Sequence, residues 1–183
     1  MAGDLLPQEL RPTGGNWGGI VFANPAAAVD PALTWSFTFD FEEITRDYGD
    51  VTPGLTVEWA ALPDYTSWRE FSGAELACGA FGKPVEASVY YFEHYRYDAV
   101  QLAVLEQDGG QIRAHVTVSG DLDDLGITEL TAEARLNFAG IIVQLPERPT
   151  SVQEAAAELA RFTSVDGLRG MDRGHNYVFV AAT

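Results

Sequence analysis

The chain contains very little cysteine and no long apolar run. Cys78 is the one cysteine among 183 residues, so no internal disulfide can form and the fold cannot depend on oxidative cross-links. Its apolar stretches fall far short of the roughly 20 residues that a membrane-spanning helix needs. Residues 1–10 have neither a basic start nor an apolar run, so we expect no signal peptide. These absences predict a cytoplasmic protein in a reducing compartment, with export by a route that leaves no apolar mark as the alternative.

Positive charge is scarce as well. The chain has 11 Lys and Arg against 27 Asp and Glu, which gives a formal net charge of −16 and a pI near 4.3. Such a surface repels nucleic-acid backbones and anionic membranes, so we expect neither as a partner. A basic protein, a metal ion or a neutral small molecule remains possible as a partner. Alternatively, the charge only keeps the protein soluble. Lys83 is the one lysine and alanine is abundant, which indicates a GC-rich bacterial coding bias.

Alternation of apolar and polar residues is the strongest local pattern, and it predicts β-strands with one buried face. It is purest over 34–41, where every second residue is aromatic, and it recurs over 55–59. From Val85 onward a meander is expected, in which 99–106 and 111–119 flank the hairpin turn Asp108-Gly109-Gly110. A shorter strand is expected over 66–71.

The remaining segments complete the predicted fold. Residues 130–138 alternate as a strand does but also contain helix formers, and we prefer a strand because all five apolar residues share one face only at period two. Residues 151–162 predict a helix, since Ser151 and Glu154 form a capping box. A final strand is expected over 176–182. The class is α+β: a mainly antiparallel, strongly curved sheet or partial barrel with one C-terminal helix packed on it.

We expect one domain over 1–183, with an irregular N-terminal arm at about 1–31. Four prolines and four glycines interrupt this arm, although a short strand around Val21 is compatible with it. The run from Gly14 to Gly19 lacks the Gly-Lys-Ser/Thr ending of a phosphate-binding loop, and no capped helix follows it. A turn that leads into a strand is therefore the preferred interpretation.

Motifs for catalysis are missing. The sequence has no Gly-x-Ser-x-Gly elbow, and Cys78 has no basic or histidine neighbour in sequence that would lower the pKa of its thiol. His94, His115 and His175 do not stand at metal-ligand spacing. We therefore expect no catalytic residue, no metal and no cofactor, and we lean against an enzyme.

The acidic segment 120–126 resembles a calcium loop in part. Asp121 and Asp123 fit the first and third ligand positions, but Leu125 occupies the fifth and Ala132 stands where a bidentate glutamate is needed. A solvated connection between strands is the default interpretation, and an acidic contact patch is the alternative.

The aromatic run 90–97 is the most suggestive feature. By alternation Tyr91, Tyr95 and Tyr97 leave on one side of a strand, while Tyr90 and His94 leave on the other. One strand face cannot bury so many rings, so either both faces are covered or some tyrosines reach the surface. Exposed tyrosines beside arginine are typical of recognition surfaces, and core packing under the helix is the competing interpretation.

The preferred function is a bacterial protein-binding module, such as a toxin-neutralising, immunity-like protein, that binds a basic partner. Its predicted contact residues are Tyr90, His94, Tyr95, Tyr97, Asp121, Asp123 and Asp124. One alternative is a ligand-binding or enzymatic β-barrel whose cavity is lined by Trp35, Trp59, Tyr91 and His115. A second alternative is a structural subunit of a phage or secretion assembly, whose arm 1–31 wraps a neighbouring subunit. A homo-oligomer is compatible with each of these.

Overall fold

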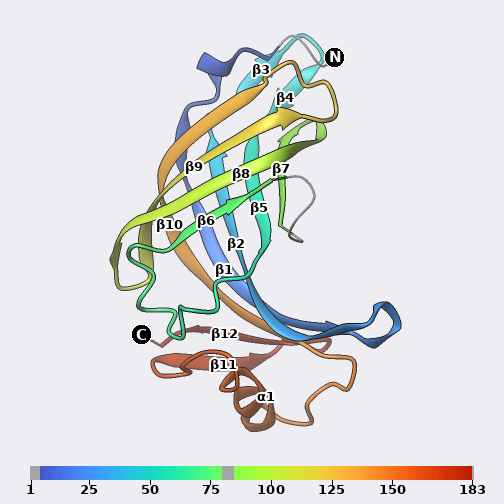
Figure 1. Cartoon of the computed structure of the whole chain (residues 1–183), viewed down its shortest axis with the longest axis vertical. Helices are drawn as coiled ribbons and strands as arrows, with labels where there is room; N and C mark the ends of the chain where they lie inside the picture. The colour runs from blue at the N-terminus through green and yellow to red at the C-terminus, as the bar shows by residue number, and fades with distance from the viewer. Residues whose placement is uncertain (1–4, 80–84, 183) are drawn as a thin grey trace.

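A computed structural model describes residues 5–79 and 85–182 and confirms the α+β class, with a mainly antiparallel sheet and one α-helix (Figure 1). The helix is α1 (Val152–Leu159), and two short 3-10 turns are η1 (Pro7–Glu9) and η2 (Pro25–Ala27). The strands are β1 (Pro12–Asn24), β2 (Val29–Phe41), β3 (Ile44–Arg46), β4 (Gly49–Val51), β5 (Gly54–Ala60), β6 (Glu75–Cys78), β7 (Glu86–Tyr91), β8 (Glu93–Asp108), β9 (Gln111–Asp121), β10 (Glu129–Gln144), β11 (Leu168–Asp172) and β12 (Tyr177–Ala181).

Seven strands form a closed sheet, which we call the barrel. Their order is β1-β2-β5-β7-β8-β9-β10, each antiparallel to the next, and β10 then pairs with β1. Because strand directions alternate and seven is odd, the first and last strands run the same way, and the closing pair must be parallel. That pair joins residues 16–22 to residues 137–144. The short strand β6 extends the wall beside β8 where β7 has not yet begun.

The segment 12–24, expected to be part of an irregular arm, is instead β1, one of the two closing strands. The glycines that hid its alternation are required by the closure. A Cβ on Gly15 would lie 1.9 Å from the Thr38 carbonyl oxygen, and one on Gly18 would lie 2.6 Å from the Gly140 carbonyl oxygen. Any other residue would force β1 away from its neighbours. The glycines of β1, which in the sequence indicate a loop, therefore allow close backbone packing.

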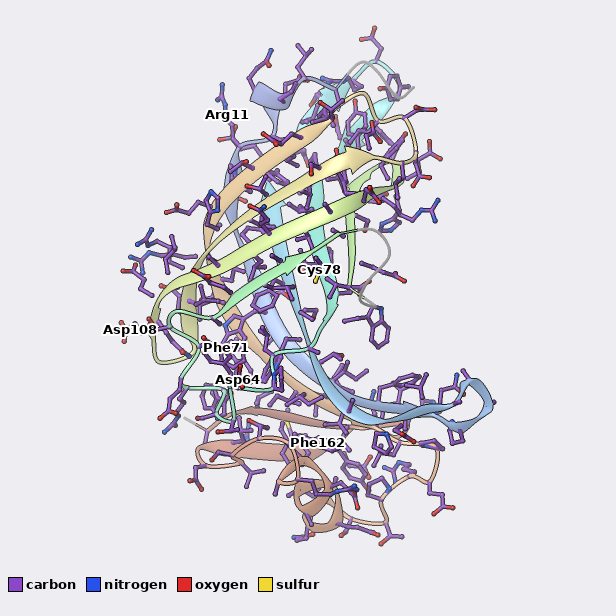
Figure 2. The ribbon with its side chains drawn as sticks, in the orientation of Figure 1. Arg11, Asp64, Phe71, Cys78, Asp108 and Phe162 are labelled. Atoms are coloured by element: carbon purple, nitrogen blue, oxygen red, sulfur yellow. The ribbon has the colours of Figure 1, made fainter. Side chains whose placement is uncertain are left out.

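Aromatic and aliphatic side chains fill the barrel interior. The alternating residues of β2, from Trp35 to Phe41, all point inward and are at most 2% exposed. Near the end of the barrel that lies toward α1, the Phe71 ring packs 4.6 Å from the Trp35 ring and 5.0 Å from the Trp17 ring, centroid to centroid (Figure 2). The Trp17 indole donates a hydrogen bond to the Gly110 carbonyl, so its one polar atom is satisfied.

Three long strands continue past the barrel into a second region, the lower sheet. Its order is β2-β1-β10-β12-β11, formed by the far halves of β2, β1 and β10 with β11 and β12 (Figure 1). The helix α1 covers the inner face, where Ala155 and Leu159 are fully buried. As predicted, the Ser151 side chain caps α1 by accepting from the Glu154 backbone N–H at 3.1 Å. The loop before α1 is tied to this sheet by the Tyr177 hydroxyl, which donates to the Pro149 carbonyl.

Several boundaries differ from the sequence-based expectations. Residues 130–138 are strand, as preferred over helix, and belong to β10. Residues 66–71 are a loop instead of a strand, and their Trp68 and Phe71 rings are buried as part of the core. The helix ends at Leu159, three residues early, and the last strand covers 177–181. The strand β11 carries no detectable alternation, and the sequence does not predict it.

The α1 helix is also too short to cross a bilayer. Within the residues that the structure describes, no helix has both the length and the apolar character that a transmembrane span requires.

Removing the Phe71 ring should destabilise the fold strongly. The ring is fully buried against Trp17 and Trp35, so Phe71→Ala leaves a cavity and should lower the free energy of unfolding by about 3–5 kcal/mol. Urea denaturation followed by tryptophan fluorescence measures this. Leu105→Ala, at a side chain that is 41% exposed, is the matched control and should change the value by less than about 0.5 kcal/mol. Equal effects of the two substitutions would contradict the packing of Phe71 between the two indoles.

Candidate functional site

The topology gathers four separate segments at the end of the barrel opposite α1. They are residues 5–11, 42–53, 92–94 and 121–128, and we call this region the acidic end (Figure 1). Its described residues include nine carboxylates and two arginines, and Arg96 lies beside them and pairs with Asp123, so the acids outnumber the bases by six. The carboxylates belong to Glu9, Glu42, Glu43, Asp47, Asp50, Glu93, Asp121, Asp123 and Asp124, and the arginines are Arg11 and Arg46. This region therefore holds a large share of the net charge of the chain.

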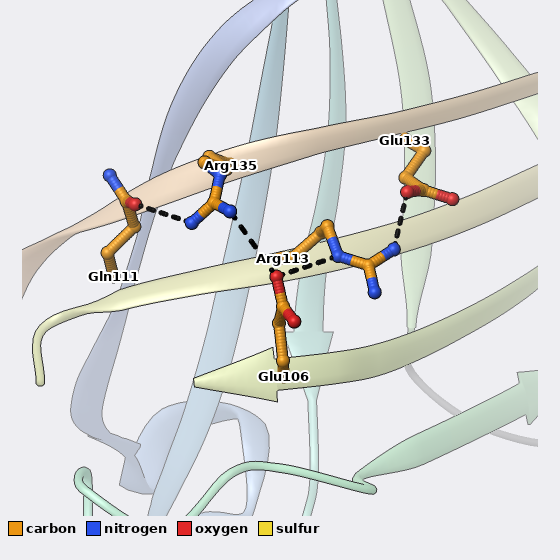
Figure 3. A network of polar contacts seen from close by, with 5 residues as sticks. All are labelled: Glu106, Gln111, Arg113, Glu133 and Arg135. Atoms are coloured by element: carbon orange, nitrogen blue, oxygen red, sulfur yellow. Dashed lines mark hydrogen bonds and ion pairs between the residues drawn. The ribbon is translucent and has the colours of Figure 1, made fainter. Parts of the chain in front are cut away.

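One part of the barrel wall is different, because the carboxylates of Glu106 and Glu133 are neutralised locally. On the outer face of β8, β9 and β10, Arg113 bridges Glu106 and Glu133 at 2.9 and 2.6 Å, and Arg135 reaches Glu106 at 3.5 Å (Figure 3). The hydrogen bond from Arg113 and its positive charge lower the pKa of the Glu106 carboxyl. Such cross-strand pairs support the sheet and leave little net field outside it.

At the acidic end several carboxylates have no such cation. Within residues 5–79 and 85–182, no ion pair involves Glu43, Asp47, Asp50 or Asp124, and all four residues are exposed. Glu42 is paired with Arg11 only at 3.6 Å, between two side chains that are both more than half exposed. Exposed pairs of this kind contribute little and are screened by salt. The acidic end therefore presents a negative field to solvent.

A polar cluster of Arg46, Glu9, Tyr91 and Tyr48 lies at this end of the barrel. The Arg46 guanidinium donates to both carboxylate oxygens of Glu9, at 3.0 and 2.8 Å, and to the Tyr91 hydroxyl at 2.9 Å. The Tyr48 hydroxyl lies 3.2 Å from the same Tyr91 hydroxyl. The hydrogen bonds to Glu9 are the main reason that the pKa of Arg46 is raised, so this side chain stays charged. The cluster anchors η1 and the β3–β4 hairpin on the barrel, which holds the surface above it in place.

Large apolar side chains are exposed at the same end. Among the described residues, six large hydrophobic side chains are exposed, and four of these lie at the acidic end or beside it. They are Leu6, Tyr48, Tyr90 and Leu122, with exposed fractions between 40% and 54%. The Tyr48 ring lies 5.1 Å from the Phe92 ring, and the Tyr90 ring lies 5.2 Å from the His94 ring. The Tyr48–Phe92 pair connects the β3–β4 hairpin with the turn between β7 and β8, and the Tyr90–His94 pair lies within the β7–β8 hairpin.

The turn at Phe92 explains how Tyr90 becomes exposed. Residues 90–97 are not one strand, since the chain reverses at Phe92, whose φ is 60°. Tyr90 and His94 pair across this hairpin and point outward together. Tyr91 and Tyr95 point inward and are at most 4% exposed.

The loop 121–124 is held by protein groups. The Arg96 side chain binds the Asp123 carboxylate through two hydrogen bonds of 2.8 and 2.9 Å, and the Arg96 backbone N–H adds a third of 2.8 Å. Asp121 accepts from the backbone N–H groups of Asp123 and Gly126. Two of the three loop carboxylates are thus satisfied internally, and Asp124 is exposed with no side-chain partner in the described part of the chain. The part of the chain that the structure describes contains no group of three or more His, Cys, Asp or Glu suited to a metal ion.

The predicted contact residues divide into two sets. Tyr90, His94 and Asp124 are exposed at or beside the acidic end, and Asp121 and Asp123 shape its loop. Tyr95 and Tyr97 lie inside the barrel, where they are 4% and 6% exposed, so a partner cannot contact them in this state. The Tyr97 hydroxyl donates to the Ile127 carbonyl, and burial is the main cause that raises the pKa of Tyr97.

Sequence reasoning missed Tyr48, Leu122, Asp47 and Asp50. Each stands in a connection that has no regular pattern. The one sequence signal for an exposed contact residue was Leu122, an apolar residue alone among acids.

The cavity residues of the ligand-binding alternative do not converge. Trp35 and Tyr91 pack within the filled interior, whereas the Trp59 ring lies 5.8 Å from the Phe22 ring on the outside of the sheet.

Asp123 should titrate at an unusually low pH. The hydrogen bonds from Arg96 lower the pKa of the Asp123 carboxyl from 3.8 to about 2. Because the pKa is lower in the folded state, the pair stabilises the protein above pH 3.8 and this contribution is lost as the pH falls toward 2. Carboxyl-carbon NMR measures the midpoint directly. Arg96→Met should return it toward 3.8, and an unchanged midpoint in this variant would contradict the assigned cause.

Comparisons with known proteins give no match. No protein-family model, no curated protein and no solved structure matches this chain.

Proposed function

We propose that the protein is a binding module whose acidic end docks a basic partner protein. The observation that carries this proposal is the coincidence of two features at one end of the barrel: four exposed carboxylates without an ion pair among the described residues (Glu43, Asp47, Asp50 and Asp124), and the exposed Tyr48, Tyr90 and Leu122 side chains. Solubility alone would explain the carboxylates but not the aromatic side chains beside them. A recognition surface explains both the charge and the exposed aromatic side chains.

The two features have separate roles in such a complex. The field of the acidic end raises the association rate of a cationic partner, since clefts or patches of one sign steer diffusional encounter. Tyrosine and leucine side chains then supply area that is desolvated on contact, and tyrosine does so with few rotatable bonds. The Arg46–Glu9–Tyr91 cluster supports the surface from below, so little ordering accompanies binding.

The partner chemistry that fits is a face with several lysines or arginines around a small apolar centre. Neutralisation of a basic toxin by an immunity-like protein in a bacterial cytoplasm is one role with this chemistry. The filled interior weighs against a ligand chamber, because Phe37, Phe39 and Leu55 occupy the space that a ligand would need. The role of a wrapping arm is equally disfavoured, since residues 12–24 are built into the barrel.

Neutralising the acidic end should abolish partner capture, while the same loss of charge elsewhere should not. The test variant is D47N/D50N/D124N, and the matched control is D64N/E70Q/D166N, which removes three exposed carboxylates near the opposite end. Both variants change the net charge equally, and none of these six carboxylates makes a side-chain hydrogen bond among the described residues. Each is used as bait on a lysate of the source organism at low salt, beside the wild type.

The expected result is a basic protein that the wild type and the control retain, that D47N/D50N/D124N loses, and that elutes as salt is raised. Isothermal titration with that purified protein should then show at least a tenfold weaker Kd for the test variant than for the control. If all three baits retain the same proteins with the same salt dependence, the acidic end is not a specific binding surface and the proposal fails.

A further inference from the structure

The lower sheet has a second face, opposite the one that α1 covers. Residues that pair across strands point to the same side of a sheet. The register therefore places Ile20, Ile142 and Val178 in one row on this face, and Val180 lies in the next row beside Gly140. Phe22 follows Ile20 two residues later on β1. We call this side the outer face of the lower sheet.

The outer face changes character along the same strands. On the barrel, outward positions of β10 are polar, as in Thr131, Glu133 and Arg135. Past the barrel they become apolar, with Gly140 and Ile142. Ile20, Phe22, Ile142, Val178 and Val180 are all partly exposed, and none of them belongs to the core or packs against it. An apolar sheet face is normally covered by a second layer, and this one has no covering element among the described residues.

Trp59 extends this face through a strained piece of backbone. A bulge in β5 sets Glu58 and Trp59 opposite the single residue Ser36 of β2, and Trp59 adopts a φ of 61°. The bulge turns the indole outward, where its ring lies 5.8 Å from the ring of Phe22. A left-handed conformation is unfavourable for a tryptophan, and bulges commonly serve to redirect one side chain. An inward ring would have joined the core, so the strained backbone serves to display an aromatic ring at the surface.

The charges at the two borders of this face indicate what kind of molecule covers it. At the β5 border Glu58 is the cross-strand partner of Glu86, and neither carboxylate has an ion pair in the described chain. At the β11 border Arg169 shares the face with its partner Val180, and the structure describes no side-chain partner for this guanidinium either. Like charges directly opposite one another destabilise a sheet. If two copies pack with these faces together about a two-fold axis parallel to the strands, the Arg169 border of each copy lies over the Glu58 border of the other. The dimer then contains two such oppositely charged contacts.

We propose that the outer face of the lower sheet binds a second copy of this chain. The two sheets pack face to face at about 10 Å, as sandwich layers do. The five strands of the lower sheet and the neighbouring β5, about 4.8 Å apart, make a face about 24 Å wide, and with a height of about 20 Å it covers on the order of 500 Å² on each copy. The total is near the lower limit for a specific interface, so a dimer of modest affinity is expected. Both acidic ends stay free, and this inference does not depend on the proposed function.

Sedimentation velocity from about 1 μM to about 300 μM tests the dimer, because small interfaces give weak dissociation constants. The wild type should shift from monomer to dimer over this range. I142T/V178T keeps the branched shape of both side chains but makes them polar, and it should raise the dimer Kd at least tenfold. Leu122→Ser, at the acidic end, should leave the Kd unchanged. Near-UV circular dichroism of the buried Trp17 and Trp35 confirms that each variant is folded.

The orientation has its own test in charge exchange. E58R and R169E should each weaken the dimer at least tenfold, and E58R/R169E should restore the wild-type Kd. A wild type that stays monomeric throughout the range overturns the proposal, as does a dimer that I142T/V178T does not weaken. A double variant no stronger than the two single variants overturns the two-fold axis parallel to the strands.

Discussion

Closure of the sheet by the parallel pairing of β1 with β10 is the constraint from which the other features follow. It brings residues 16–22 against residues 137–144 and removes both free edges from the barrel. The closed wall fixes which loops share an end, so residues 5–11, 42–53 and 121–128 meet although they are far apart in sequence. Without this pair the chain would be an open meander with exposed edges, and the acidic segments would not form one surface.

The same pair also explains the two-part architecture. Strands β1 and β10 are 13 and 16 residues long, which is more than the barrel needs. The parts of β1 and β10 beyond the barrel form the lower sheet. There β12 pairs with the edge of β10 that pairs with β9 in the barrel. The inner face of the barrel continues as the face under α1, and the outer wall continues as the apolar face that displays Trp59. One set of strands thus supports both the acidic end and the outer face, on regions well separated in space (Figure 1).

Alternation and capping made much of the fold predictable. Residues 34–41 and 111–119 indicate strands because one buried face requires period two, and the Ser151 cap indicates α1. The closing strand β1 was hidden, since close backbone contact at Gly15 and Gly18 demands the residue that elsewhere indicates a turn. At the site, alternation separated Tyr90 from Tyr91 correctly. It could not show the reversal at Phe92, nor that the barrel would bring Tyr48 beside it, because both depend on tertiary pairing.

Closure has a further consequence for synthesis on the ribosome. About 120 residues separate the paired positions of β1 and β10, so at a rate of about 5–20 residues per second β1 is made roughly 6–24 s before the strand that it needs. During that interval the hairpin of β1 and β2 has an unsatisfied edge and four large aromatic side chains of β2 without a complete interior around them. The nascent chain therefore passes through a period in which it can associate wrongly. The segments translated in that period carry more acidic than basic residues, and this like charge opposes contact between neighbouring nascent copies.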